Sequence, residues 1–296
     1  MHTSATSTPA PSLAPSRTTA SNWHAQLRMD YKRQDARTVV HHQHQGPLRI
    51  LQSLYPEGDA VCHNVLVHPP GGLVGGDLME IDVHLQAHAH GLVTTPGATR
   101  FYRSDKGLAT QQVRAHIGEH ARLEWLPLET IAYNGCQGVN HAVFDLAPTA
   151  ELMAWDITAL GLPNANLPFE RGQLQQHLEV AGVWLERGLI DAQDTRLMDG
   201  PLGLAKHRCM ATLVFACGTD LPRDRRDVAL SLARALTDAA PEGLVAGVTS
   251  PHPRILVLRT LSPLVEPAQT LLRGVWAAWR QGLWSMTGAL PRIWAM

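Results

Sequence analysis

The stretch HPPGGLVGGDLMEIDVHL, from His68 to Leu85, decides the fold class because a turn runs directly into an alternating strand. Two prolines and four glycines fall within the nine residues that end at Asp77. After the turn, the apolar residues of one parity alternate with polar ones: Met79, Ile81, Val83 and Leu85. This is the period of a half-buried β-strand. Asp77 shares the apolar parity, so we expect the turn to direct a carboxylate toward the interior.

Similar strand-like runs recur along the chain and predict a mainly β, many-stranded, layered fold. They begin near Trp23 and are often separated by Gly, Pro and Asn. The further runs lie at about 37–43, 61–67, 78–85, 90–95, 110–117, 121–126, 140–146, 150–160, 172–180, 182–190, 208–216 and 253–260. Three loosely similar segments contain Leu92, Leu123 and Leu152, which are 31 and 29 residues apart. That spacing suggests solenoid-like stacking of β-layers, and chance repetition within a β-sandwich explains it equally well.

Two helices are predicted near the C-terminus. One covers DVALSLARALTDA from Asp227, which has an apolar stripe and acidic residues near its start. The other begins with Ser262 as N-cap and Pro263 in the first turn, and its apolar face continues to Leu283. Residues 1–21 are rich in Ser, Thr, Pro and Ala and predict a disordered lead-in. We expect residues 22–296 to form a single domain.

Composition excludes several classes of protein. A net charge of −1 and a pI near 7.0 provide no field for nucleic acid or for an anionic membrane surface. No run approaches 18 uninterrupted apolar residues, so no membrane-spanning helix is predicted. The first 21 residues lack the apolar segment of a secretory signal. The four cysteines form no CxxC pair, which favours a reduced, cytoplasmic setting.

Four carboxylates occupy strand positions where a buried sheet face would carry hydrocarbon: Asp77, Glu124, Asp156 and Glu186. An ionised carboxylate removed from water costs several kcal/mol unless it is paired, hydrogen-bonded or metal-bound. Any one of them is explained by backbone donors or by an arginine, such as Arg100, Arg103 or Arg187. Four together favour a shared polar path.

The 16 histidines are an unusual excess. The HHQH run at 41–44 and the set His84, His88 and His90 lack a spacing fixed by helix geometry, so we expect them on a solvated strand face. His68, directly before two prolines, is a separate candidate for metal binding. The glycine-rich turn lacks the Lys-Ser/Thr of a phosphate-binding loop and precedes a strand, whereas a dinucleotide site needs a helix there.

Four motifs give the chain a family resemblance. HPPGGLVGGD at 68–77, TTPGATRFYRS at 94–104, LEWLPLETI at 123–131 and PRIW at 291–294 occur in the order seen in the urease accessory protein UreD, also called UreH. The chain resembles this family over about residues 22–296. The resemblance implies a predominantly β, layered fold with helices toward the C-terminus.

The resemblance also implies a function. UreD-like proteins are non-enzymatic chaperones that bind apo-urease and, with UreF-like and UreG-like partners, help to deliver Ni²⁺ to its active site. Such a protein has no tightly bound cofactor and carries nickel transiently, through an internal water-filled route lined by polar and acidic side chains. Asp77, Asp156 and Glu186 match family acidic residues implicated in function. Thr99 and Glu124 lie within the matching motifs and join them as candidates, together with His68.

Two further features bear on partners. Trp276 and Trp279 are expected to face the core, whereas Trp284 and Trp294 are expected near a UreF-like partner, because tryptophan favours interface anchors. Leu162 and Leu167 occupy positions where many family members carry an arginine and a glutamate. Roles of those two family residues therefore do not carry over to this chain.

Two other functions remain open. A cytoplasmic metal-dependent hydrolase on a β scaffold would use His68 and the inward acids around one tightly bound metal with three or four fixed ligands. A purely structural binder would remodel urease without touching metal. A conduit differs from both, because it must bind nickel weakly, at several successive places.

Overall fold

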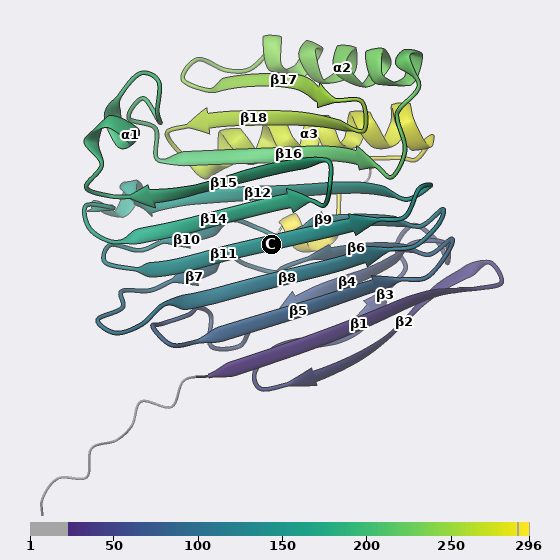
Figure 1. Cartoon of the computed structure of the whole chain (residues 1–296), viewed down its shortest axis with the longest axis horizontal. Coiled ribbons are helices and arrows are strands. Elements are labelled where there is room, and N and C mark those ends of the chain that lie inside the picture. Colours follow the sequence, from purple (N-terminus) through teal and green to yellow (C-terminus); the bar gives the residue numbers. More distant parts are fainter. Residues whose placement is uncertain (1–22, 289, 296) are drawn as a thin grey trace, which may run out of the picture.

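The computed structural model describes residues 23–288 and 290–295, and the predicted lead-in at 1–21 lies outside them. Two large β-sheets face one another, and two long helices cover the outer side of the second sheet (Figure 1). The mainly β, layered fold expected from the sequence is confirmed.

The first sheet has seven strands in the order β15-β14-β11-β8-β5-β1-β2. Its five central strands are parallel to one another, and β2 and β15 join antiparallel at the edges. The strands are β1 (His24–Gln34), β2 (Arg37–Gln45), β5 (Leu78–Leu85), β8 (Ala109–Ile117), β11 (Gln137–Leu146), β14 (Gln173–Val180) and β15 (Trp184–Asp191).

The second sheet has eleven strands, and its main path is β17-β18-β16-β12-β9-β6-β4-β3. The four strands β4, β6, β9 and β12 are parallel, and the others on this path pair antiparallel. The main strands are β3 (Arg49–Leu54), β4 (Cys62–Val67), β6 (His90–Thr94), β9 (Arg122–Leu126), β12 (Glu151–Leu162), β16 (Cys209–Cys217), β17 (Val245–His252) and β18 (Ile255–Ser262). Short strands extend it: β7 (Thr99–Phe101), β10 (Thr130–Ala132) and β13 (Leu167–Pro168).

The solenoid-like repeat is confirmed, because the chain passes from one sheet to the other three times in the same way. Strands β5, β8 and β11 of the first sheet lead into β6, β9 and β12 of the second. Leu123 pairs in register with Gly91 on one side and with Leu152 on the other. The spacing of about thirty residues in the sequence is therefore one circuit of the chain around the two sheets.

The glycine-rich turn is shaped by close contact with the second family motif. A Cβ atom on Gly72 would lie 2.4 Å from the Tyr102 ring, and Gly71 and Gly76 have φ angles of 77° and 94°. Only glycine adopts such angles without strain. Leu73 donates its N–H to the Arg100 carbonyl at 2.7 Å, so the turn is attached to the segment that carries Thr99.

Two hydrophobic clusters stabilise the layers. The cluster between the sheets contains Met79, Ile81, Val83 and Leu85, all at most 4% exposed, which confirms the alternation that predicted β5. The second cluster lies between the second sheet and the helices α2 (Arg223–Asp238) and α3 (Val265–Trp284). The remaining helical turns are α1 (Thr195–Asp199), η1 (Pro163–Ala165) and η2 (Arg292–Ala295).

Both long helices begin elsewhere than predicted. The prediction that Ser262 caps the last helix is wrong, because Ser262 pairs with Cys209 at the end of β18. Helix α3 begins at Val265, and Leu264 is its N-cap, without a side-chain hydrogen bond. Helix α2 begins at Arg223, four residues before Asp227.

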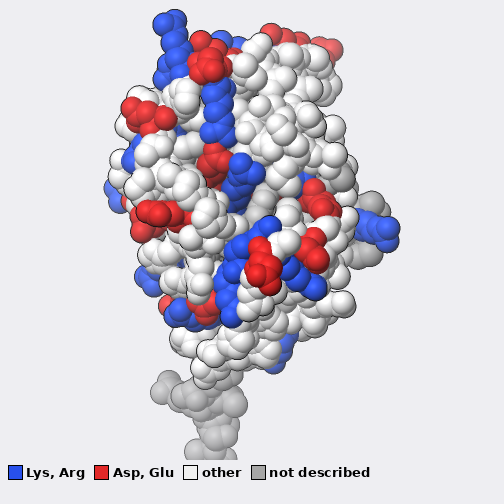
Figure 2. Space-filling view, turned by 90° about the vertical axis from the view of Figure 1, so that its right-hand side faces the viewer, with Lys and Arg blue, Asp and Glu red and all other residues white. Residues whose placement is uncertain are grey.

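None of the helices in the described residues has both the length and the apolar run that a membrane crossing requires. Acidic and basic side chains are intermixed on the end of the molecule seen in Figure 2. This agrees with the near-zero net charge of the whole chain.

Candidate functional site

A cavity of about 50 Å³ lies between the two sheets. One water requires roughly 10–15 Å³ of such space, so a few waters fit. Hydrocarbon side chains form much of its wall, including Ile81 and Leu178. Polar side chains from both sheets also line it: His68, Thr95, Thr99, Gln111, Thr130, Asn140 and Asp156. Three of the residues predicted from the sequence thus meet here, namely His68, Thr99 and Asp156.

Asp156 lies in the middle of β12 and accepts hydrogen bonds from neutral donors. Asn140 donates to Oδ2 at 2.7 Å, and Gln176 and Thr158 donate to Oδ1, both at 3.0 Å. Burial, together with the nearby Glu186 charge, outweighs these hydrogen bonds and raises the pKa of Asp156 to about 6. Among the described residues, the hydrogen-bond donors to this carboxyl group are all neutral, and none is a cationic side chain.

Glu186 lies on β15 and, as its parity predicted, points toward the opposite sheet. It lines a second cavity of about 10 Å³ together with Asp156, Gln176, His177 and Thr212. Thr212 donates its hydroxyl to Oε1 of Glu186 at 3.1 Å. Arg259 donates Nε to Oε2 at 2.8 Å, and its Nη2 lies 2.7 Å from the same oxygen. Asp156 lines both cavities, so its side chain lies between Glu186 and the larger space between the sheets.

His68 and Thr99 mark the other part of the larger cavity. His68 comes directly after β4, and Thr99 begins β7. Burial lowers the pKa of His68, and the charge of Asp77 acts in the opposite direction. A neutral imidazole has a nitrogen lone pair available for a metal ion.

Asp77 closes the glycine-rich turn through its carboxylate. It accepts the N–H of Val74 at 2.9 Å and the N–H of Trp23 at 3.2 Å. Its own N–H donates to the Val74 carbonyl at 3.0 Å. These bonds fix the start of β5 beside β1. The residue is half-buried and does not line either cavity, so a part for it in a metal path stays a prediction.

Glu124 lies on the opposite side of the second sheet, where α3 packs. It is fully buried and accepts hydrogen bonds from His90 at 2.7 Å and from Trp276 at 2.6 Å. The Nε atom of Arg280 lies 3.3 Å away. Burial opposes ionisation, but His90 and Arg280 hold the pKa of Glu124 below its usual value. A metal role for Glu124 stays a prediction, and the structure gives it a clear part in attaching α3.

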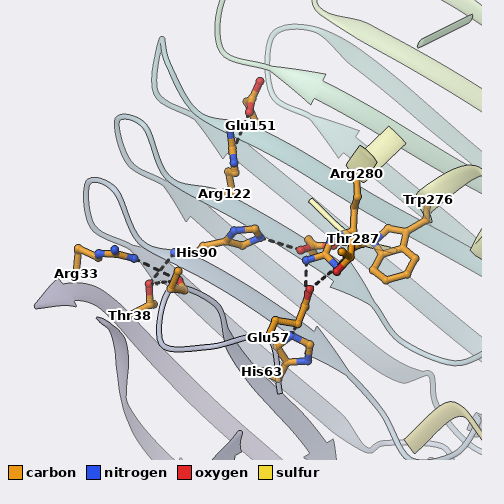
Figure 3. Close-up of polar contacts among 12 residues, drawn as sticks. Arg33, Thr38, Glu57, His63, His90, Arg122, Glu151, Trp276, Arg280 and Thr287 are labelled. Carbon is orange, nitrogen blue, oxygen red and sulfur yellow. Dashed lines mark hydrogen bonds and ion pairs between the residues drawn. The ribbon is translucent and has the colours of Figure 1, made fainter. Parts of the chain in front are cut away.

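The same network continues to Glu57, as Figure 3 shows. Arg280 donates to both oxygens of Glu57 at 2.8 and 3.0 Å, and Glu57 also contacts His63 at 2.8 Å. Burial opposes ionisation of Glu57, yet His63 and Arg280 together lower its pKa to about 2. Two acids, one arginine and two histidines therefore form a buried charge network under α3.

Comparison with known proteins decides the family. The model of the UreD urease accessory protein family matches residues 24–295. The chain belongs to the UreD family of urease accessory proteins. It is 59% identical over 274 residues to the urease accessory protein UreD of Variovorax paradoxus, covering 93% of this chain and 99% of that one. It is 60% identical over 274 residues to the UreD of Albidiferax ferrireducens, with the same coverage.

A more distant relative gives the same result. The chain is 51% identical over 275 residues to the urease accessory protein UreD of Leptothrix cholodnii, which covers 92% of this chain and 99% of the relative. The resemblance stated from the four motifs is confirmed. Membership in the UreD family supports a role in urease maturation, and this family is an accessory family and not a catalytic one.

In this UreD-family chain the histidines divide between surface and interior. His84 stacks on His116 and His88 on His120, with ring centroids 5.0 and 4.9 Å apart. The expectation of a solvated strand face is confirmed for His84 and the HHQH run, whereas His88 is exposed but lies in the turn between β5 and β6. The expectation is wrong for His90, which is 7% exposed, because His90 begins β6 in the other sheet, beneath α3.

Trp284 and Trp294 are buried, with 6% and 7% of their surface exposed. Trp276 and Trp279 are fully buried. Trp294 donates its indole N–H to Thr94 at 2.8 Å and packs on Trp155 and Trp276. The inward orientation expected for Trp276 and Trp279 is confirmed. A partner-binding role for Trp284 and Trp294 stays a prediction, and the structure places both rings in the core under the helices.

Leu162 and Leu167 pair with one another across the short hairpin between β12 and β13. Leu167 is 54% exposed. The two positions at which the resemblance led us to expect an arginine and a glutamate therefore lie at the edge of the second sheet and line neither cavity.

The neutral partners of Asp156 and the arginine bound to Glu186 were not predicted from the sequence. Gln176 and Thr158 share the parity of buried residues in their own strands, and a search for all polar residues at apolar positions would have found them. Arg259 is separated from Glu186 by 73 residues and gave no such signal. Within residues 23–288 and 290–295, no three His, Cys, Asp or Glu side chains converge as a ready metal site.

Proposed function

We propose that this chain carries Ni²⁺ during urease maturation, along the polar path from His68 and Thr99 through Asp156 to Glu186. It would do so bound to apo-urease and in a complex with UreF-like and UreG-like partners. The observation that carries the proposal is that Asp156 lines both cavities, and so connects the space between the sheets with Glu186 at the edge strand. The proposal extends the role in urease maturation to a specific route for the metal.

The chemistry of the lining suits a cation in transit. Carboxylate, hydroxyl, amide and imidazole groups bind divalent metals less tightly than a closed set of thiolates. Asp156 is held by three neutral donors, so a cation reaching it would not have to displace a protein cation. Passage requires sites that bind enough to admit the ion and weakly enough to release it.

The setting that we propose is the cytoplasm, where thiols stay reduced. All four cysteines are free and buried: Cys62, Cys136, Cys209 and Cys217. Burial raises the pKa of the Cys136, Cys209 and Cys217 thiols to about 12, so these three are protonated at neutral pH when no metal is bound.

The test is nickel loading of apo-urease by the assembled accessory complex. Asp156→Asn and Glu186→Gln keep the shape of each side chain and remove its charge. We expect complexes with either variant to assemble normally and to deliver less nickel, measured by metal analysis of the re-isolated urease. Asp145→Asn is the matched control, because Asp145 is an exposed carboxylate of β11 that lines neither cavity.

Equal delivery by Asp156→Asn, Glu186→Gln and the wild type would contradict the nickel path. Equilibrium dialysis of the isolated chain against Ni²⁺ and Zn²⁺ separates the remaining functions. The path requires weak binding that Asp156→Asn diminishes. One tight stoichiometric site, together with hydrolytic turnover by the isolated chain, would support a metal-dependent hydrolase instead.

A further inference from the structure

The second sheet extends beyond the first at the β15 edge. Strand β15 is the last of the seven-stranded sheet, whereas β16, β18 and β17 continue the eleven-stranded sheet past it (Figure 1). An open groove of about 480 Å³ lies over these three strands. Glu186, Met210, Ala211 and Thr212 line both this groove and the small cavity that contains Asp156. Glu186 therefore lies between the groove and the interior acid.

Three residues form a row across the second sheet beneath Glu186. Asp156 pairs in register with Thr212, and Thr212 pairs in register with Arg259. Neighbouring strands are about 4.8 Å apart, so the row leads in even steps from the buried acid to the groove. Glu186 bonds to the second and third members, at 3.1 Å to Thr212 and 2.8 Å to Arg259.

The ion pair between Arg259 and Glu186 is exposed enough for another cation to replace the arginine. The Arg259 side chain is 59% exposed and that of Glu186 is 23% exposed. An ion pair this exposed contributes little net stability, because water screens the charges and both side chains lose freedom. The guanidinium bonds to a carboxylate that lines both the groove and the small cavity.

The surroundings leave Arg259 room to withdraw. Its register partner on β17 is Gly247, and a Cβ atom at Gly247 would meet nothing within 4 Å. The ring of Trp184 lies 5.7 Å from the guanidinium carbon, at a distance where an aromatic face attracts a cation. The arginine could thus leave Glu186 without losing all of its favourable contacts.

We propose that Arg259 is a gate on the metal path: its guanidinium neutralises Glu186 until a divalent cation takes its place, so that Arg259 sets how readily metal passes between the groove and the interior. This inference rests on the proposed function and adds the residue that controls its mouth. Arg259 is a positioning residue and not a metal ligand, because a guanidinium has no free lone pair to donate.

The test compares Ni²⁺ binding and uptake for purified wild type, Arg259→Gln, Arg259→Lys and Glu186→Gln. Removing a competing exposed charge of this kind changes an affinity by about two- to fivefold. We expect Arg259→Gln to bind Ni²⁺ more tightly by that factor in calorimetry. We also expect it to take up Ni²⁺ faster in stopped flow, because no guanidinium has to leave Glu186 first. Arg259→Lys keeps the positive charge but loses the planar contact through two nitrogens. Its Ni²⁺ affinity should therefore lie between those of the wild type and Arg259→Gln.

Arg254→Gln is the matched control. Arg254 lies in the turn before β18 and donates to the Gly218 carbonyl at 2.7 Å, so its charge does not cover a path carboxylate. It should leave nickel affinity and uptake unchanged. On the Glu186→Gln background, Arg259→Gln should have no further effect, because the gate has lost its partner.

The outcomes separate the gate from the path. If Arg259→Gln and Arg259→Lys match the wild type while Glu186→Gln weakens binding, the gate is overturned and the path survives. If Glu186→Gln and Asp156→Asn bind nickel as the wild type does, the path itself fails. An effect of Arg259→Gln that persists on the Glu186→Gln background would also overturn the gate, because it would come from general surface charge.

Discussion

Asp156 and Glu186 belong to different sheets, yet their side chains line the same small cavity, and the Thr212 hydroxyl donates to Glu186 from the register position beside Asp156. The two acids differ in their partners. Glu186 holds an arginine, whereas Asp156 is surrounded by neutral donors. A cation that enters from the groove would therefore first meet Glu186, which is paired with an arginine. It would next meet Asp156, which is bonded to neutral donors.

The raised pKa of Asp156 predicts a specific pH dependence of stability. The pKa is about 6 in the folded chain and 3.8 for an ordinary Asp. A folded chain that holds this proton more tightly loses stability as the pH rises from about 4 to about 6, and not beyond. The free energy of unfolding of the wild type minus that of Asp156→Asn should fall over this range by on the order of 1–3 kcal/mol. A difference that stays flat in urea unfolding from pH 4 to pH 7 would contradict the burial of an ionisable Asp156.

Substitutions of Asp77 test whether this residue stabilises the glycine-rich turn or takes part in metal transfer. Asp77→Ala removes the acceptor of two backbone N–H groups, and each hydrogen bond contributes about 0.5–1.5 kcal/mol. We expect a loss of about 1–3 kcal/mol in urea unfolding for Asp77→Ala. Asp77→Asn keeps one acceptor oxygen and should lose less. Nickel delivery should decrease only as far as stability does. Poor delivery by a stable Asp77→Asn protein would instead place Asp77 on the metal path.

The network under α3 predicts a large mutational effect far from the path. Arg280 is fully buried and bonds to Glu57 and to the Thr287 carbonyl. Removing one partner of a buried ion pair leaves the other charge uncompensated and costs about 3–5 kcal/mol. Arg280→Ala should lower the free energy of unfolding by this amount. Arg223→Ala, which breaks an exposed pair 3.7 Å long with Asp227, is the control and should cost at most about 0.5 kcal/mol. A similar small cost for Arg280→Ala would show that the network does not hold α3.

The same network predicts acid sensitivity through Glu57. Its pKa is lowered from 4.5 to about 2, so its contribution to stability is complete above pH 4.5 and is lost as the pH falls toward 2. Glu57→Gln should therefore lose less stability than the wild type between pH 4.5 and pH 2. Circular dichroism during acid titration measures the difference. Parallel curves for the two proteins would argue against the strong pairing of Glu57.

The sequence predicted those elements whose pattern is local. Alternation identified β5 and its buried residues, and the three leucines identified the repeat. Strand β17 was not predicted, because VAGVTSPH lacks alternation and contains both Gly247 and Pro251. Strand β3 was not predicted either, since its pairing with β4 is irregular between Ile50 and Ser53.

Part of the site was also within reach of the sequence. Parity placed Asp156 and Glu186 on inward faces, and both line the cavities. The same parity could not distinguish them from Glu124, which faces the helices on the other side of the sheet. Whether a buried side chain points toward the other sheet or toward the helices depends on how the layers stack. The pairing of Glu186 with Arg259 depends on how the edge of one sheet lies over the other. Neither is encoded in a single strand.

The most direct measurement is anomalous X-ray diffraction at the nickel edge from crystals of this chain soaked in Ni²⁺. We expect an anomalous peak between the carboxylates of Asp156 and Glu186 in the wild type, with Arg259 turned away from Glu186. The peak should be absent from Asp156→Asn crystals soaked in the same way. Nickel bound only to surface histidines, with the Arg259–Glu186 pair intact and the space around Asp156 free of metal, would contradict the nickel path.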